Sequence, residues 1–367
     1  MLVLTYACNL RCSFCYAAAE VFTRPKTMSP GEARRSVDFL AALGITSFTL
    51  LGGEPTVYRH LKELVAYSRS LGLGPWLVTN GTRTCDPDFC RALLDAGLKG
   101  GCVSLHGASA EDHDRQVGIP GSHAQALQTI AHAVENGWPL FPMLTIMNGN
   151  LLAVRRLIDT LVGLGCRTIY INYGLPNIVP EWDTGVDAGP PALAQMTERL
   201  FSLQEELNVR FRFNREKNKV PLCHFDQDTL RQMLTDEAIG TGCEAVQGNS
   251  VIIEPGGSVL GCSHWVDHPV LNIYRNFETL ELISVEEFWE SWLTGKAAQF
   301  RHELGWFPYE QCGDCDWRKQ GLCYGGCKVW QSAGVLPRLA RHDDTPAGPA
   351  DNPILTRLSL SVLSELR

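Results

Sequence analysis

The sequence predicts an α/β fold, in which a partial (β/α)6 TIM-like barrel is followed by a small cysteine-rich α+β domain. Two observations support this prediction. Over the first 213 residues, short apolar runs alternate with helical patterns, at a pitch typical of parallel strands joined by crossover helices. Beyond residue 240 the alternation stops, and closely spaced cysteines take its place. The expected division is a barrel at 1–213, a bridging segment at 214–240, the cysteine-rich domain at 241–345 and a tail with one helix at 346–367.

The expected elements follow in order along the chain. Helix 30–43 has the clearest boundaries, because Ser29 suits its N-cap, Pro30 its first turn and Gly44 its end. The six expected strands are the apolar runs at 2–6, 45–51, 75–79, 100–105, 139–146 and 168–172. The other helices are expected at 57–71, 86–97, 122–136 and 150–164, and a helix at 192–207 with a strand at 209–213 closes the first domain. Six units are too few for a closed eight-stranded barrel, so we expect an open one.

Composition excludes several classes of protein. The chain has 367 residues and a net charge of −8 without a long basic run, so nucleic acid is not an expected partner. No apolar stretch approaches the length of a membrane span, and the start of the chain is too short for a signal peptide, so we expect a cytoplasmic protein without a membrane partner. Fourteen cysteines in such a compartment favour metal binding over disulfides.

The first loop holds three of these cysteines, Cys8, Cys12 and Cys15, at Cys-x3-Cys-x2-Cys spacing. Three thiolates on so short a loop can converge on one metal centre. They lack the fourth ligand that would close a four-iron cluster or a tetrahedral zinc site. An open position of this kind can bind a substrate or a cofactor directly. A zinc knuckle, or three unrelated buried thiols, would have the same spacing.

This loop resembles the signature of the radical S-adenosylmethionine (SAM) enzymes, which have an aromatic residue where this chain has Phe14. The resemblance implies a 4Fe-4S cluster on the three cysteines, whose open iron chelates the amino and carboxylate groups of SAM. In that family, one electron from the cluster cleaves SAM to methionine and a 5′-deoxyadenosyl radical. The radical then removes a hydrogen atom from an unactivated C–H bond.

Other candidate SAM contacts lie after the predicted strands, at the edge where parallel α/β sheets bind ligands. Gly52-Gly53-Glu54-Pro55 resembles the GGEP motif, which binds the amino group of SAM in this family; by itself it could be a simple turn. Ser104-Leu105-His106-Gly107 resembles the Ser-Leu/Ile-Asp-Gly segment of family members with a C-terminal cluster domain. The remaining candidates are Asn80, Asn148, Asn172 and Arg115. Of these, Arg115 could bind a carboxylate such as that of SAM.

Two residues of the fourth strand are candidate catalytic groups. His106 replaces the family's acidic residue and could alter the proton chemistry, because histidine titrates near neutral pH. Cys102 shares a strand face with Ser104 and His106, and a thiol beneath the substrate could donate a hydrogen atom to a substrate radical. A loop histidine and a core cysteine are the alternative interpretations.

The back half contains the patterns Cys243-x13-Gly257-x4-Cys262 and Cys312-x2-Cys315-x7-Cys323-x3-Cys327. Together they resemble the SPASM domain of peptide-modifying radical SAM enzymes, which carries two auxiliary 4Fe-4S clusters. The resemblance implies one cluster on Cys243, Cys262 and Cys327, with Cys223 as a possible fourth ligand. The other would take Cys312, Cys315 and Cys323. A final cysteine is missing, so its fourth ligand must be another residue, such as His342, or be absent. A vestigial second cluster, or zinc, is the alternative.

The resemblance therefore implies a radical SAM oxidoreductase with one or two auxiliary clusters. The leading substrate is a ribosomally made peptide, modified by cross-linking, oxidation or epimerisation. A reductant such as flavodoxin or ferredoxin would supply electrons. Met1 lies just before the first strand, so a separate protein could provide peptide recognition. The alternatives are a dehydrogenase or epimerase acting on a sugar or another small natural-product intermediate, and a non-catalytic zinc or iron–sulfur scaffold.

Overall fold

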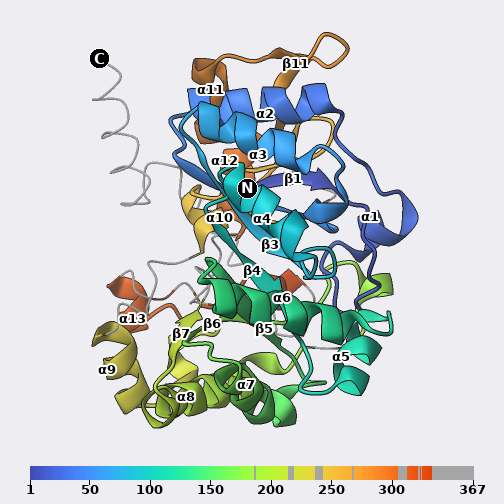
Figure 1. Cartoon of the computed structure of the whole chain (residues 1–367). Helices are drawn as coiled ribbons and strands as arrows, with labels where there is room; N and C mark the ends of the chain where they lie inside the picture. The colour runs from blue at the N-terminus through green and yellow to red at the C-terminus, as the bar shows by residue number, and fades with distance from the viewer. Residues whose placement is uncertain are drawn as a thin grey trace.

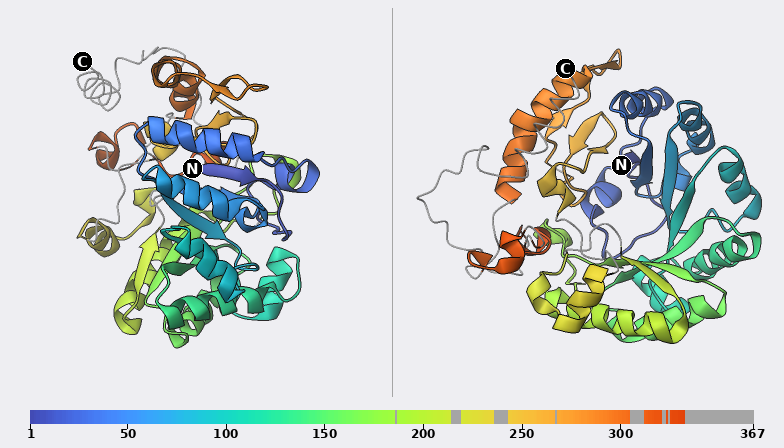
Figure 2. Two further views of the ribbon diagram at one scale, coloured as in Figure 1. Left: turned by 45° about the horizontal axis from the view of Figure 1, so that its top comes forward. Right: turned by 90° about the vertical axis from the view of Figure 1, so that its left-hand side faces the viewer.

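The computed structural model describes residues 1–185, 187–213, 219–235, 243–266, 268–304, 312–320, 323 and 325–332. Its main feature is a curved sheet in which seven strands run parallel in chain order, with helices on the outside (Figures 1 and 2). These strands are β1 (Leu2–Thr5), β2 (Ser47–Gly52), β3 (Gly74–Thr79), β4 (Gly100–Ser104), β5 (Leu140–Ile146), β6 (Thr168–Tyr173) and β7 (Arg210–Phe213). The predicted partial barrel is confirmed, and the predicted closing strand is its seventh parallel strand.

The outer helices of the barrel alternate with these strands. They are α1 (Ala18–Thr23), α2 (Pro30–Ala42), α3 (Leu61–Ser70), α4 (Pro87–Asp95), α5 (Ala110–Val117), α6 (Ser122–Asn136), α7 (Val154–Gly163) and α8 (Gly189–Leu207). Short 3-10 turns follow three of the strands, at η1 (Pro55–Val57), η2 (Leu151–Ala153) and η3 (Pro180–Trp182). Buried apolar residues from the outer helices and the strands form two large clusters.

The back half extends the open edge of the same sheet. Strands β8 (Ile252–Ile253) and β9 (Ser258–Leu260) form the hairpin predicted around Pro255-Gly256-Gly257. β8 pairs in parallel with β1, and β10 (Leu271–Asn272) continues the sheet beyond β9. The sheet therefore has ten strands in the order β10-β9-β8-β1-β2-β3-β4-β5-β6-β7.

The other elements of the back half lie at both ends of the sheet. They are η4 (Leu222–His224), α9 (Gln227–Thr235), α10 (Glu244–Gln247), β11 (Tyr274–Asn276), β12 (Glu281–Leu282), α11 (Val285–Thr294), α12 (Lys296–Leu304), α13 (Asp316–Lys319) and α14 (Val329–Ser332). Of these, η4 packs against α8. In Figure 2, the orange α11 and α12 lie beside the gap that the barrel leaves open. The predicted tail helix and His342 lie outside the described residues.

Glu32 connects the two halves. It completes the capping box of α2 with Ser29, the N-cap that the sequence predicted. Its other carboxylate oxygen accepts a hydrogen bond from the amide of Gly256 at 3.0 Å. Its backbone carbonyl accepts another, from the Tyr274 hydroxyl at 3.1 Å. A local helix cap thus also fixes the back-half hairpin to the barrel. Separately, none of the described helices is long and apolar enough to cross a membrane.

Candidate active site

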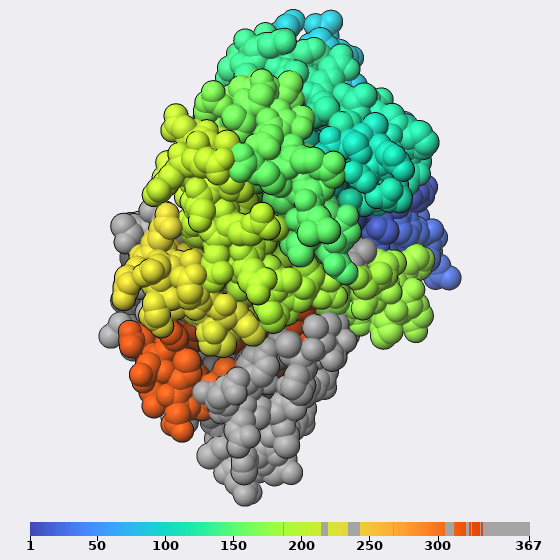
Figure 3. All heavy atoms as spheres, turned by 90° about the horizontal axis from the view of Figure 1, so that it is seen from below, coloured from blue at the N-terminus to red at the C-terminus, as the bar shows by residue number. Residues whose placement is uncertain are grey.

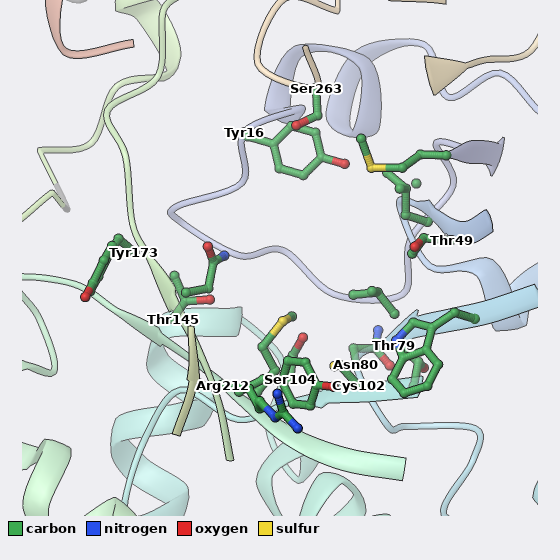
Figure 4. A pocket seen from close by; sticks show the side chains of 18 of the residues that line it. Tyr16, Thr49, Thr79, Asn80, Cys102, Ser104, Thr145, Tyr173, Arg212 and Ser263 are labelled. Carbon is green, nitrogen blue, oxygen red and sulfur yellow. The ribbon is translucent and has the colours of Figure 1, made fainter. Parts of the chain in front are cut away.

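One large pocket occupies the inside of the barrel (Figure 4). Its volume is about 1460 Å³, larger than the roughly 300–1,000 Å³ of a pocket for one small ligand. The first cysteine loop and the carboxyl ends of the strands form one part of its wall. Inward-facing side chains of the strands form another part, namely Thr49, Trp76, Cys102, Ser104, Thr145, Tyr170, Asn172 and Arg212. The pocket therefore has room for a cofactor and a second molecule.

Cys8, Cys12 and Cys15 all line this pocket. Burial raises the pKa of each thiol, to about 11 for Cys15, and neighbouring thiols raise the pKa of Cys12 and Cys15 further because the charges would repel. Backbone amides oppose this rise at Cys8, whose sulfur accepts from the amide of Leu10 at 3.4 Å. The three neighbouring thiols are costly to ionise on their own, and one of them accepts a hydrogen bond from a backbone amide. Both features fit a site in which bound iron balances the negative charge of the thiolates.

The spacing of the three thiols can be compared with the spacing that one metal ion would need. Among the described residues, no three His, Cys, Asp or Glu side chains meet closely enough to hold one ion. In a four-iron cluster each thiolate binds a different iron, so its ligands lie farther apart than those of one ion. The three thiols, which all line the pocket, would hold such a cluster together.

Backbone contacts from two parts of the barrel fix the cysteine loop. The backbone amide of Gly53 donates to the carbonyl of Thr5 at 2.8 Å, and that of Glu54 donates to the carbonyl of Ala7 at 2.9 Å. On the other side, the amides of Arg11 and Ser13 donate to the carbonyls of Val117 and Gln116, at the end of α5. Hydrogen bonds to β2 and α5 thus hold the loop.

The two glycines of the predicted GGEP motif make the contact with β2 possible. A Cβ atom on Gly53 would lie 2.4 Å from the carbonyl oxygens of both Tyr6 and Ala7, and one on Gly52 would lie 2.2 Å from that of Thr5. The sequence predicted close approach of this turn to a ligand. The structure shows that its first close partner is the backbone of the cysteine loop.

Glu54 is buried and joins the ends of β2 and β3. Its Oε1 accepts from the amide and hydroxyl of Thr56 and from the hydroxyl of Thr79, while Oε2 accepts from the amide of Asn80 at 2.7 Å. Burial raises the pKa of Glu54, and these hydrogen bonds oppose the rise. A carboxylate offers about four acceptor sites, and since Oε1 takes three donors here, any further donor would have to approach Oε2.

Asn80 connects β3 to the cysteine loop. Its amide group donates to Asn9 at 2.8 Å, and its oxygen accepts from the amide and hydroxyl of Thr82. Asn9 in turn donates to the Thr82 hydroxyl at 2.8 Å. The predicted ligand Asn80 does line the pocket, but its side chain also closes a polar ring that positions the loop.

Three buried histidines lie beneath Phe14 at the end of β4. The Phe14 ring meets His106 edge-on at 4.7 Å between centroids, and His106 stacks on His113, which lies 5.5 Å from His123. Burial lowers the pKa of His106 to about 3 and that of His113 to about 4, and in each case a neighbouring histidine lowers it further. Burial thus favours the neutral ring of His106 at pH 7, with a pKa below the usual titration range that the sequence expectation assumed, and its catalytic role stays a prediction.

Cys102, Ser104 and His106 share the face of β4 that was predicted to point into the barrel, and all three line the pocket. Figure 4 shows Cys102 and Ser104 together on the floor of the hollow, with Arg212 from β7 nearby. Burial raises the pKa of the Cys102 thiol to about 12, so the thiol stays protonated at neutral pH. Asn172, on β6, lines the same pocket.

Two predicted SAM contacts point elsewhere. Arg115 lies on the exposed face of α5, 61% exposed, where it pairs with Asp112 at 2.8 Å and with Glu111. Asn148 is exposed in the loop after β5. Neither lines the pocket. Both follow strands that end at the correct edge, but helix and loop conformation beyond the strand turn their side chains outward.

Two functional candidates gave no signal in the sequence. Lys219 is buried, lines the pocket and donates to Asn172 at 2.9 Å and to the carbonyl of Tyr173. Asn150 is buried and its amide group donates to the carbonyls of His106 at 3.0 Å and Thr145 at 2.8 Å. A single lysine or asparagine in a loop has no distinctive pattern, because its role depends on contacts distant in sequence.

The back-half cysteines gather around Lys328, which is 2% exposed. Burial lowers the pKa of Lys328 to about 8, and nearby thiols oppose the shift. These thiols belong to Cys243, Cys327, Cys312 and Cys323. Cys262, at the end of the β8–β9 hairpin, is half-buried against the same apolar cluster as Cys243 and Cys327. None of the fourteen cysteines forms a disulfide.

Fold and site together define a partial-barrel protein with an open three-thiol site at the carboxyl ends of its strands. Residues 2–161 match the family model described as the radical SAM superfamily. The front half of the chain is thus similar to the radical SAM superfamily, whose members are iron–sulfur enzymes that use a 4Fe-4S cluster and SAM.

Curated relatives align over most of the chain. An AdoMet-dependent heme synthase of Methanosarcina barkeri is 25% identical over 337 residues, which cover 89% of this chain and 89% of that protein. A PqqA peptide cyclase of Methylobacterium nodulans is 28% identical over 329 residues, which cover 89% of this chain and 79% of that protein.

Two solved structures share the fold. One is native anSMEcpe with bound AdoMet and a Cp18Cys peptide, with a TM-score of 0.68 and 16% identity; the match covers 100% of this chain and 97% of that one. The other is Streptococcus suis SuiB bound to the precursor peptide SuiA, with a TM-score of 0.66 and 14% identity; the match covers 93% of this chain and 74% of that one.

Proposed function

We propose that this chain is a radical SAM oxidoreductase that modifies a ribosomally made peptide and carries auxiliary clusters in its cysteine-rich half. One observation carries the proposal: the pocket of about 1460 Å³ exposes three thiols at one wall and leaves space for a second molecule beside SAM. The resemblance to SuiB and anSMEcpe, both described with bound peptides, supports a peptide as that molecule. So does the likeness to the PqqA peptide cyclase.

Individual residues have distinct roles in this proposal. Cys8, Cys12 and Cys15 hold the cluster, and the Gly52–Glu54 turn offers backbone carbonyls and Oε2 of Glu54 to the ammonium of SAM. Cluster and SAM together would supply the 5′-deoxyadenosyl radical that removes a hydrogen atom from the substrate. Ser104 and Asn172 face the bound molecules from the barrel wall. Lys219 braces Asn172 and the end of β6.

Cys102 is suited to return a hydrogen atom if the reaction is an epimerisation. Its thiol lies inside the barrel and, with a pKa of about 12, keeps its proton at neutral pH. The S–H bond would break and a new C–H bond would form on the substrate. The remaining sulfur radical would need one electron and one proton, and a flavodoxin or ferredoxin is the expected electron source.

The proposal is tested on protein purified and reconstituted without oxygen. With SAM and dithionite we expect 5′-deoxyadenosine, and with a uniformly deuterated precursor peptide we expect that product to gain deuterium, measured by mass spectrometry. Because only a molecule that donates its hydrogen to the radical labels the product, this readout identifies the substrate directly. Absence of iron, or of SAM cleavage by iron-loaded protein, would refute the proposal.

A second candidate substrate is a small molecule. The observation that favours it is the alignment with the heme synthase, which extends over 89% of both chains. Deuterium transfer from a labelled tetrapyrrole or another small candidate, without transfer from any peptide, would favour this alternative.

A further inference from the structure

The later cysteine site consists of Cys312, Cys315 and Cys323 and lacks an obvious fourth ligand. No cysteine follows Cys327, and the sequence suggested His342 for this place. The same sequence reasoning assigned Cys223 to a different cluster, that of Cys243 and Cys262. The choice between these assignments depends on how the segment around Cys223 packs and on which thiols lie near it.

Segment 219–223 is fixed against the end of the cysteine-rich region. The carbonyl of Lys219 accepts hydrogen bonds from the amide of Cys327 and from the indole of Trp330, both at 2.9 Å. The contact is so close that a Cβ atom on Gly326 would lie 2.8 Å from both the Lys219 carbonyl oxygen and the Pro221 ring. Only a glycine permits this approach.

Apolar burial sets the direction of the segment. Val220 and Leu222 are 1% and 0% exposed and pack in the same core cluster as Cys323 and Trp330, whereas the next residue, Cys223, is exposed. Cys223 lies in the short turn η4, which follows Pro221 directly. Figures 1 and 3 show this part of the chain, next to α9, lying against the segment that contains α13 and the later cysteines.

The later cysteine site is also prepared for thiolates. The amide of Gly325 donates to the sulfur of Cys323 at 3.4 Å, a contact that stabilises a negatively charged sulfur. The Arg318 guanidinium donates to the carbonyls of Cys312 and Gly313, both at 3.2 Å, and so fixes the first turn of the site.

Electrostatic contacts locate Cys223 relative to these groups. Partial desolvation raises the pKa of Cys223, and neighbouring thiols raise it further. The neighbouring thiols are those of Cys323, Cys312 and Cys315, which are the three members of the later cysteine site.

We propose that Cys223 is the fourth thiolate of the later cysteine site and closes it for a 4Fe-4S cluster. This inference rests on the proposed function, since it requires that the cysteine-rich half binds iron. In this proposal the fourth ligand comes from the bridging segment, whereas the sequence suggested a residue such as His342. It also leaves the cluster on Cys243, Cys262 and Cys327 with three thiolates and therefore with an open iron.

The test compares iron, sulfide and the electron paramagnetic resonance spectrum of reduced full-length variants. Wild type should hold about twelve irons. Cys223→Ala should lose about four of them, or about one if a three-iron cluster remains, with a changed spectrum. Cys223→Ser is the milder variant, and we expect its spectrum to change while its circular dichroism stays that of wild type. Wild-type iron content and spectrum in both variants would overturn the assignment.

Two variants serve as controls. Cys85 is half-exposed, its thiol donates to the Thr82 carbonyl at 3.0 Å, and it does not line the pocket. Cys85→Ala should therefore retain the full iron content. His342→Ala tests the rival ligand, and loss of iron there with none in Cys223→Ala would overturn the proposal. Wild type without any iron would instead refute the proposed function itself.

Discussion

The two cysteine regions of this molecule are built in opposite ways. In the front region, the proposed ligands Cys8, Cys12 and Cys15 lie on one loop, which backbone hydrogen bonds from β2 and α5 hold in place. In the back region, the later cysteine site as proposed combines Cys223 with residues about 90 positions further along the chain. The front site is thus organised by the barrel, whereas the back site has to bring distant segments together. We expect bound metal to contribute more to the structure of the back region than to that of the front.

The largest expected effect is chemical and concerns the front region. Cys12→Ala removes one of three ligands from a site that has no spare one, so 5′-deoxyadenosine formation should fall to background, and about four irons should be lost. Product formation by chromatography and iron content check both. The barrel itself should stay folded, because the loop is held by hydrogen bonds independent of the metal. Retained SAM cleavage would show that the site does not hold the cluster.

Metal removal compares the two regions directly. In protein stripped of iron, amides of the cysteine-rich segment 312–330 should exchange hydrogen at least ten-fold faster, because metal binding and local folding are coupled there. Amides of β1 and of the loop that follows it should change much less. Hydrogen exchange followed by mass spectrometry measures both. Equal loss of protection in the two regions would break the distinction between them.

Gly53→Ala tests whether backbone contact organises the front region. The new Cβ atom would meet two carbonyl oxygens at 2.4 Å, so the turn or the cysteine loop has to move, at a cost of about 3 kcal/mol. Urea unfolding and iron content should both report the change. Gly163→Ala is the matched control, since its Cβ atom meets nothing within 4 Å and alanine should add up to about 1 kcal/mol near a helix end. Similar behaviour of the two variants would contradict the argument.

Acid should weaken the front region through its buried histidines. The folded pKa values of about 3 for His106 and about 4 for His113 lie below the usual value near 6.5, so the unfolded chain takes up protons first as pH falls. Their contribution to stability is complete above pH 7 and decreases below pH 6.5. At pH 5 each histidine should cost about 2 kcal/mol. Urea unfolding at pH 7 and pH 5 measures this, and His106→Gln should remove about half of the difference.

The comparison also explains how far sequence reasoning reached. The spacing of Cys8, Cys12 and Cys15 predicted a common site because ligands within one loop are necessarily near each other. The strand pattern likewise predicted that Cys102 and Ser104 face the barrel interior, because alternation fixes the face of a strand. Both predictions concern local geometry, which neighbouring residues determine.

The residues whose surroundings the sequence could not show depend on contacts between distant segments. Glu54 stays a candidate SAM contact through Oε2, but the three donors on its Oε1 come from Thr56 and Thr79, and no motif shows that they converge there. The proposed place of Cys223 differs from the one that the sequence suggested, because the packing of Lys219 against Cys327 and Trp330 is not encoded in any spacing. His106 was expected to titrate because its burial was not visible in the sequence.

The smallest expected effect concerns Arg115, which the sequence suggested as a SAM contact. Its ion pairs with Asp112 and Glu111 are exposed, and exposed pairs of this kind contribute about 0.5 kcal/mol or less. Arg115→Ala should therefore change the free energy of unfolding by no more than this, and the Kd for SAM by less than two-fold. Equilibrium dialysis with iron-loaded protein measures the affinity, with Ser104→Ala as the comparison variant from the pocket wall. A large loss of affinity in Arg115→Ala alone would mean that α5 turns inward when SAM binds. In that case the front region would not be preorganised, and its contrast with the back region would fail.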